Sequence, residues 1–207
     1  MVIRTTASDL MLQGLPRIVL ASASPRRREL LHQLGIAHDV LAVDIDETPL
    51  PGEEPGALAS RLALAKAVEG RRRSDGTRPV LGADTVVALG ADIHGKPRDR
   101  DDAVRMLTTL GGHLHQVLTA VAVAPAGNAP ALTALSVTQV RMRAIGATEA
   151  GAYWDCGEPA GKAGAYAIQG LGAVFIEHIA GSYSGVMGLP LYETARLLQA
   201  VGSGREG

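Results

Sequence analysis

The sequence predicts an α/β protein built around a mixed, twisted sheet with flanking helices. Short runs rich in Val, Leu and Ile alternate with segments whose apolar residues recur at helical spacing. No internal repeat and no low-complexity tract interrupts this alternation. The chain has 207 residues, of which 46% are hydrophobic, enough to bury a sizeable core. We expect one domain over residues 16–207, preceded by a loose extension over residues 1–15.

The first part of the chain alternates extended and helical segments. Residues 17–21 form an apolar, β-branched run, which predicts a strand. Leu30, Leu31 and Leu34 then recur at helical spacing before Gly35, a typical end of a helix. Further along, a segment rich in Ala, Leu and Lys favours a second helix. The elements expected there are an extended stretch at 40–44, turns at 49–56 and a helix at 58–68.

The remaining elements follow from similar signals. Residues 79–89 form a very apolar run typical of a buried strand, and residues 99–110 carry acidic residues in their first turn, as helices do. Thr148 is a suitable cap for a helix that runs through Tyr153, and Pro190 suits the start of a last helix. The other expected elements are turns at 90–97, paired strands at 117–124 and 132–142 across a loop at 125–130, and a last helix to about Ala200.

Composition excludes several classes of partner. Aromatic residues make up only 3% of the chain, too few for stacking platforms on single-stranded nucleic acid. The formal net charge of −1 gives no general attraction to a polyanion or an anionic membrane. Cys156 is the only cysteine, and no secretory signal or run of transmembrane length is present. We expect a cytoplasmic protein that binds neither a nucleic-acid polymer nor a membrane.

The segment Ser22-Ala23-Ser24-Pro25-Arg26-Arg27-Arg28 lies where a strand turns into a helix. Free backbone N–H groups and the positive end of a helix meet at such a turn, which favours an anion. Ser24 can cap the helix, Pro25 suits its first position, and Arg26 or Arg27 can add a charged fork to a phosphate. An ordinary capped helix with a solvated basic face is the alternative.

Asp84 lies near the end of the apolar run 80–87, where a carboxylate needs a partner or a metal ion. It fits a ligand of a divalent cation, an acceptor of a proton from water, or a structural acid bonded to nearby backbone. Glu47 belongs to an acidic patch suited to magnesium or manganese, although such patches are often only solvated. Lys66 and Lys96 can each reach a polyphosphate or lie on the surface.

Two other patterns do not match known sites. His113 and His115 lie two residues apart, but no nearby Cys or acid completes a zinc pattern. The Gly-rich stretch 161–172 fits neither the P-loop nor the dinucleotide-binding pattern.

Several short motifs follow one another along about residues 18–198. The motifs are Leu20-Ala21-Ser22-Ala23-Ser24-Pro25-Arg26-Arg27, Gly82-Ala83-Asp84-Thr85, Gly95-Lys96-Pro97, His115-Gln116-Val117-Leu118-Thr119-Ala120-Val121, Gly157-Glu158-Pro159 with Lys162-Ala163-Gly164-Ala165-Tyr166-Ala167-Ile168-Gln169-Gly170, and Gly181-Ser182-Tyr183 with Val186-Met187-Gly188-Leu189-Pro190-Leu191. Taken in this order, they resemble the motifs of the Maf family.

The resemblance implies two lobes around a central cleft, similar to the inosine triphosphate pyrophosphatases. It implies hydrolysis of nucleoside triphosphates to monophosphate and pyrophosphate. The segments around Gln169 and Tyr183 resemble the subgroup that acts on dTTP and UTP, with modified pyrimidine triphosphates as further candidates. House-cleaning of nucleotide pools, a link to cell-division arrest and a homodimer are also implied. The alternative is a nucleotide-binding regulator of septum formation with little turnover.

Residue roles also follow from the resemblance. Asp84 is the expected proton acceptor, and a magnesium or manganese ion is expected at Asp84 and Glu47. The expected determinants of substrate choice are Arg26, Thr85 and Gln169. The resemblance implies that Lys66, Lys96 and Lys162 bind phosphate. The strand-to-helix turn described above adds Ser22, Ser24 and Arg27 as expected phosphate-binding residues. Two departures from the family pattern, Gly161 in place of Asp and Gly185 in place of Asn or Ala, bear on fine specificity.

Overall fold

The computed structural model describes Leu15 and residues 17–203. The predicted extension over residues 1–15 lies, apart from Leu15, outside the described residues. The elements are β1 (Ile18–Leu20), α2 (Pro25–Gln33), β2 (His38–Val40), α3 (Pro55–Arg73), β3 (Val80–Leu89), β4 (Asp92–His94), α4 (Arg100–Leu110), β5 (Leu114–Ala124), β6 (Leu132–Met142), α5 (Ala147–Asp155), η1 (Ala163–Ala165), η2 (Leu171–Phe175), β7 (Ile176–Ala180), α6 (Tyr183–Met187) and α7 (Leu191–Ser203).

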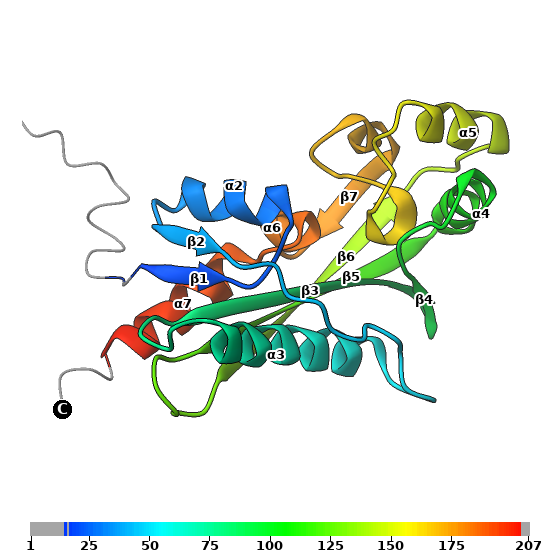
Figure 1. Ribbon diagram of the computed structural model, residues 1–207. Coiled ribbons are helices and arrows are strands. Elements are labelled where there is room, and N and C mark those ends of the chain that lie inside the picture. Colours follow the sequence, from blue (N-terminus) through cyan, green and yellow to red (C-terminus); the bar gives the residue numbers. More distant parts are fainter. Residues whose placement is uncertain (1–14, 16, 204–207) are drawn as a thin grey trace, which may run out of the picture.

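The described strands form one seven-stranded mixed sheet, which confirms the predicted class. Its order is β2-β1-β3-β5-β6-β7, and β4 also pairs with β3. The strand β1 runs parallel to β2 and β3, whereas the pairs β3–β4, β3–β5, β5–β6 and β6–β7 are antiparallel. The long strands β3, β5 and β6 run through the whole molecule (Figure 1) and therefore join its two ends.

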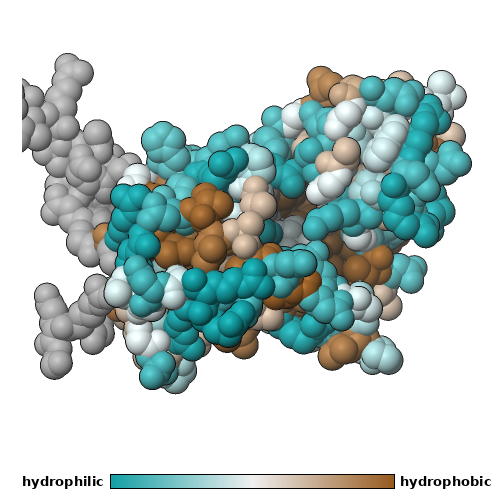
Figure 2. Space-filling model, viewed as in Figure 1, coloured by the Kyte–Doolittle hydropathy of each residue, from teal (hydrophilic) through white to brown (hydrophobic). Residues whose placement is uncertain are grey.

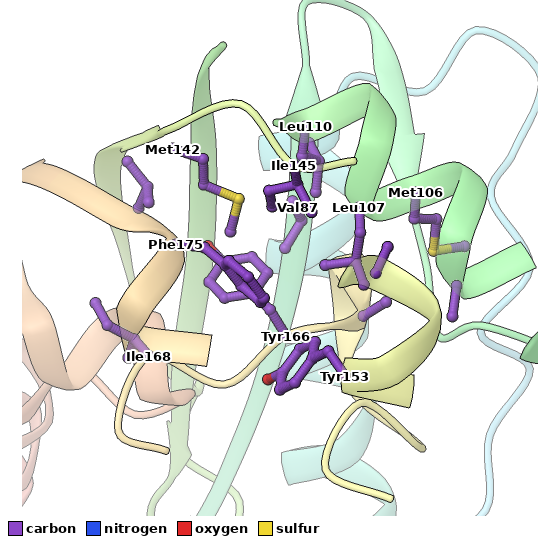
Figure 3. Close-up of a cluster of buried hydrophobic side chains, with 14 of the residues drawn as sticks. Val87, Met106, Leu107, Leu110, Met142, Ile145, Tyr153, Tyr166, Ile168 and Phe175 are labelled. Atoms are coloured by element: carbon purple, nitrogen blue, oxygen red, sulfur yellow. The ribbon is translucent and has the colours of Figure 1, made fainter. Parts of the chain in front are cut away.

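Helices cover both faces of the sheet, and three apolar clusters result. Helix α3 packs against one face in a cluster built largely of alanines. Helices α2 and α7 pack on the other face at one end of the strands, and α4 and α5 pack at the far end (Figure 1). Figure 3 shows this last cluster, in which Tyr153, Tyr166 and Phe175 supply the aromatic side chains. The surface is hollowed between the two ends (Figure 2).

The strand β3 has one edge that is only partly covered. The neighbour β1 pairs with Val80 and Leu81, and β4 pairs with residues 87–89. Within the described chain, no strand pairs with that edge over residues 82–86. The opposite edge pairs with β5 from Val80 to Ala88. A short open edge is thus left in the middle of the sheet, and Asp84 lies at its centre.

Helix α3 approaches β3 closely because small residues line the contact. A Cβ atom added to Gly82 would lie 2.4 Å from the carbonyl oxygen of Ala63 and 2.5 Å from the amide nitrogen of Ala67. At the other end of the helix, a Cβ on Gly70 would lie 2.8 Å from Val80 Cγ1. These distances are far below van der Waals contact, so the helix can lie this close to the strand only with glycine at both positions.

Most elements lie near their predicted positions, with several differences. The extended stretch predicted at 40–44 ends at Val40, because its partner β1 is only three residues long. Helix α3 begins at Pro55, inside the predicted turns, with proline in its first turn. The predicted turn region at 90–97 contains β4, which forms a hairpin with β3.

The prediction of a Thr148 cap was wrong. Gly146 is the N-cap residue of α5, and no side chain caps that helix. The short elements β7 and α6 were not predicted. All five residues of β7 are exposed or only partly buried, so its sequence lacks the clear apolar alternation that marks a strand.

We expect Gly82→Ala to lower the free energy of unfolding by about 1–3 kcal/mol, because the new methyl group must push α3 away from β3. Denaturant unfolding followed by circular dichroism measures this change. Gly202→Ala in α7 is the matched control, since no atom lies within 4 Å of its added Cβ. An unchanged stability in Gly82→Ala would contradict the close packing described here.

Candidate functional site

Charged side chains from separate segments meet at the open edge of β3. Lys66 Nζ lies 2.6 Å from Asp84 Oδ1 and 2.6 Å from Glu47 Oε1. Lys96 Nζ lies 3.2 Å from the other oxygen of Glu47. The structure therefore brings together four residues that the sequence singled out separately: two carboxylates and two ammonium groups.

The inner pair of this cluster is withdrawn from water. The side chains of Lys66 and Asp84 are 10% and 11% exposed, whereas those of Glu47 and Lys96 are 43% and 62% exposed. The ammonium group of Lys66 has two carboxylate partners, which offset the cost of withdrawing it from water. Partial burial acts to raise the pKa of Glu47, but Lys66 and Lys96 outweigh burial and hold that pKa below its usual range. Glu47 is therefore ionised at neutral pH.

Asp84 and Thr85 point to opposite faces of the sheet, as neighbours in a strand do. Asp84 faces α3, and Thr85 faces α2 and α6. The Arg27 guanidinium donates to Thr85 Oγ1 over 3.4 Å and to the carbonyl oxygen of Gly188 over 2.9 Å. The buried Thr119 hydroxyl donates to the carbonyl oxygen of Gly185 over 2.7 Å and lies 3.0 Å from Thr85 Oγ1. Thr85 is thus tied to Arg27 and Thr119.

The turn after β1 has the local structure that the sequence predicts. Ser24 caps α2 by accepting from the Arg27 amide, and Pro25 is the first helical residue. The Ser22 hydroxyl accepts from the Ser24 amide and from Arg27 Nη1, each over 3.2 Å. Burial lowers the pKa of the Arg27 guanidinium, and the Asp84 charge opposes this change. Arg27 therefore joins the turn to the Asp84 cluster.

Arg26 faces the other end of the molecule. Burial lowers its pKa, and the charges of Glu29 and Glu158 oppose that effect. Burial also lowers the pKa of Lys162, with the positive charge of Arg26 as the next cause. The positive charge of Arg26 therefore acts on Lys162 although the two residues lie far apart in the sequence.

Gln169 lies on an exposed turn of the same end of the molecule. Its side chain makes no hydrogen bond to the residues that the structure describes. The segment begins at Tyr166, whose hydroxyl lies 3.0 Å from Nε2 of the buried His115. Within the part of the chain that the structure describes, no hydrogen bond or ion pair joins Gln169 to Asp84, so Gln169 and the carboxylate cluster are separate parts of the candidate site.

Sequence reasoning did not single out Thr119, Tyr153 or Glu158 as members of the site. Thr119 is a polar residue inside the apolar run 117–124, the same signal that drew attention to Asp84. Glu158 could have been identified as a candidate because it lies in the motif Gly157-Glu158-Pro159. Gly161, where the family commonly has Asp, has a φ of 70°, a conformation that glycine adopts at no steric cost.

Within the described chain, no group of three or more His, Cys, Asp or Glu side chains could hold a metal ion. The metal ligands expected from the sequence, Asp84 and Glu47, are both bound to Lys66. Their oxygen atoms suit a hard divalent cation, and magnesium is commonly held by one or two carboxylates together with substrate phosphates.

Two carboxylates and two ammonium groups thus converge on the open edge of β3. The chain belongs to the family of Maf-like proteins, whose sequence model matches residues 17–201. A dTTP/UTP pyrophosphatase of Xanthomonas campestris pv. campestris is 51% identical over 189 residues, which cover 90% of this chain and 99% of the relative. A dTTP/UTP pyrophosphatase of Bordetella parapertussis is 51% identical over 195 residues, which cover 90% of this chain and 93% of the relative.

Solved structures give a weaker match. A nucleoside-triphosphatase (dITP/XTP pyrophosphatase) of Mycobacterium abscessus aligns with a TM-score of 0.40 and 16% identity over 63% of this chain and 76% of that chain. In the part of the protein that the structure covers, no helix is both long enough and apolar enough to span a membrane.

We expect the buried His115 to make the protein less stable in mild acid. Burial lowers its pKa from 6.5 to about 4, so the unfolded chain binds the proton more readily than the folded protein does. Stability should therefore fall as the pH drops from 6.5 toward 4, with His115 contributing a loss of about 2 kcal/mol between pH 7 and pH 5.

Denaturant unfolding at pH 7 and pH 5 tests this expectation. The glutamine in His115→Gln cannot be protonated in this range. The stability that this variant loses between pH 7 and pH 5 should therefore be smaller than the wild-type loss by about 2 kcal/mol. Equal losses in the two proteins would contradict the assignment.

Proposed function

We propose that this chain is a nucleoside triphosphate pyrophosphatase that hydrolyses dTTP and UTP to nucleoside monophosphate and pyrophosphate. Modified pyrimidine triphosphates are further candidate substrates. The observation that carries the proposal is the buried Asp84 carboxylate, held by Lys66 beside Glu47 and Lys96 at an open strand edge. Relatives about half identical over nearly the whole chain are named for the same activity, which supports it.

The cations around the open edge suit a triphosphate. Lys66 binds Asp84 and Glu47, and Lys96 binds Glu47. Arg26 and Lys162 are the further cations that we propose to act on the phosphates. The start of α2, which Ser24 caps, adds the positive end of a helix. Arg27 already has three partners in Ser22, Thr85 and Gly188, so we expect it to act mainly by shaping this turn.

A magnesium or manganese ion fits the two carboxylates, and Asp84 and Glu47 are the residues that would hold it. Such an ion offsets phosphate charge and lowers the pKa of bound water. Lys66 now holds both carboxylates, so its ammonium group would have to turn toward the phosphates. Lys66 would then bind the triphosphate as a point charge.

We assign the role of proton acceptor to Asp84. In the proposed reaction, a water oxygen bonds to the α-phosphorus, the bond from that phosphorus to the bridging oxygen breaks, and pyrophosphate leaves with the bonding electrons. The Asp84 carboxylate takes the proton of the attacking water. Lys96 and Arg26 would offset the charge that develops on the leaving pyrophosphate.

Base choice is proposed to lie with Gln169, helped by Arg26 and Thr85. An amide both donates and accepts, which suits the N–H and carbonyl groups of uracil or thymine. Thr85 is hydrogen-bonded to Arg27 and Thr119, so its effect on base choice would pass through Arg27. In the cell we propose a cytoplasmic, homodimeric enzyme that removes unwanted pyrimidine triphosphates, with a link to cell-division arrest.

We expect Asp84→Asn to remain folded and to lose at least about 100-fold in turnover, since a general base contributes about 10²–10⁴-fold. Lys66 keeps Glu47 as its partner in this variant. Pyrophosphate release from UTP and dTTP with magnesium or manganese measures the loss, and Asp101→Asn, on the exposed first turn of α4, is the control. Full activity in folded Asp84→Asn would exclude Asp84 as the base.

A chelator should abolish the wild-type activity if a divalent cation takes part. Hydrolysis that is insensitive to chelator would remove the metal from the proposal. Tight binding of UTP without pyrophosphate release, at any metal concentration, would favour the regulator of septum formation instead.

We expect Gln169→Ala to lower the preference for UTP over CTP by at least about tenfold, because one side of the base would lose its hydrogen bonds. The ratio of kcat/KM for the two nucleotides measures the preference. Gln139→Ala, another exposed glutamine on the distant strand β6, should leave that ratio unchanged. If the ratio is the same in Gln169→Ala and the wild type, Gln169 does not read the base.

A further inference from the structure

The turn that carries Gln169 is tied to the protein by two side chains, Tyr153 and Glu158. The Tyr153 hydroxyl accepts from the Ala167 amide over 3.1 Å and donates to Glu158 Oε1 over 2.5 Å. The Glu158 carboxylate accepts from the Leu171 amide over 2.9 Å and from the Gly172 amide over 3.0 Å. The pair therefore binds the backbone on both sides of Gln169.

The glycines of this turn are explained by the same two side chains. A Cβ added to Gly170 would lie 2.1 Å from Glu158 Oε2, and one added to Gly172 would lie 2.5 Å from the Tyr153 hydroxyl. The backbone thus lies directly against the carboxylate and the phenol. This part of the Gly-rich stretch, which matches no nucleotide-binding pattern, makes room for that contact.

Tyr153 and Glu158 are themselves held in place. Tyr153 is only 6% exposed, and its ring packs edge-on against Phe175 with 5.1 Å between centroids. Both rings belong to the cluster shown in Figure 3, and the Tyr153 hydroxyl lies at the edge of that cluster. Burial acts to raise the pKa of Glu158, but Tyr153, the two amides and Lys162 outweigh it, so the pKa lies below its usual range. Glu158 therefore remains an acceptor at neutral pH.

The same carboxylate lies next to the phosphate-binding side of the site. Lys162 donates to the main-chain oxygen of Glu158. The charge of Glu158 also acts on Arg26, which comes from the other end of the molecule. Glu158 thus connects the turn of Gln169 with two of the cations proposed to bind phosphate.

We propose that Tyr153 and Glu158 are positioning residues that set base selectivity by fixing the turn at residues 167–172 and so placing Gln169. Neither side chain has to touch the substrate. The proposal rests on the proposed function, because it assigns the base-reading part of that site. Backbone that is held on both sides of Gln169 fixes the point from which its side chain extends, and so restricts the positions that its amide group can reach.

Three variants test the proposal. Tyr153→Phe keeps the ring packing and removes only the hydroxyl. Glu158→Gln keeps the shape but puts an NH₂ group opposite an amide that needs an acceptor. In the double variant, the change in base preference should be much smaller than the sum of the changes in the two single variants, since both substitutions release the same turn. Asp155→Asn, which changes an exposed carboxylate at the end of α5, is the matched control.

Two measurements are needed for each protein. Hydrogen exchange followed by mass spectrometry reports the amides of residues 167–172. Calorimetric binding of the non-hydrolysable α,β-methylene analogues of UTP and CTP, with magnesium present, reports base preference without turnover. Steady-state kinetics with UTP and CTP then separates KM from kcat.

We expect faster exchange at residues 167–172 in Tyr153→Phe and Glu158→Gln, together with at least about a fivefold loss of the UTP-over-CTP binding preference. KM for UTP should rise more than kcat falls, because uniform binding is lost. Asp155→Asn should match the wild type in every measurement. Faster exchange with an unchanged preference would overturn the positioning role, and so would unchanged exchange in both single variants.

Failure of the proposed function would look different. If the wild type binds the analogues with a UTP preference but releases no pyrophosphate from UTP, the proposed hydrolysis is wrong and the positioning role is still decided by the binding data. If the wild type binds the two analogues equally, the proposal of base selectivity through this turn is overturned.

Discussion

The buried ion pair between Lys66 and Asp84 is the interaction on which the rest of the site depends. Withdrawing an ammonium and a carboxylate from water is costly unless each finds a close partner. That partnership requires α3 to lie against β3, which the absence of a side chain at Gly82 permits. The Lys66 ammonium group also binds the Glu47 carboxylate, and Lys96 in turn binds the other oxygen of Glu47. One close helix–strand contact therefore orders four charged groups.

The gap in the sheet lets these groups meet a ligand. A strand inside a sheet normally has both edges covered, and its side chains then reach only the two faces. Because β1 and β4 stop short of each other along β3, Asp84 and Thr85 lie at an open edge although they point to opposite faces. Residues on α3 and on α2 thus approach the same place from the two sides of the sheet.

Sequence reasoning was most successful where local signals are strong. Apolar runs marked β3, β5 and β6, and Ser24 with Pro25 marked the start of α2. The prediction that Lys66, Lys96 and Asp84 belong to one site needed the family resemblance, and the bond from Lys66 to Asp84 depends on packing between separate elements. The roles proposed for Tyr153 and Glu158 were not predicted, because their contacts, with each other and with backbone amides, form only when separate segments of the chain pack together.

The three separate apolar clusters have a consequence for how this protein can change. The alanine-rich cluster supports Asp84 and Lys66, whereas the cluster with Tyr153, Tyr166 and Phe175 supports the turn of Gln169. Substitutions in the second cluster can reshape the turn without disturbing the packing of α3 on β3. A lineage, or a protein engineer, can therefore alter the turn that we propose to read the base while the pair of Lys66 and Asp84 is inherited intact.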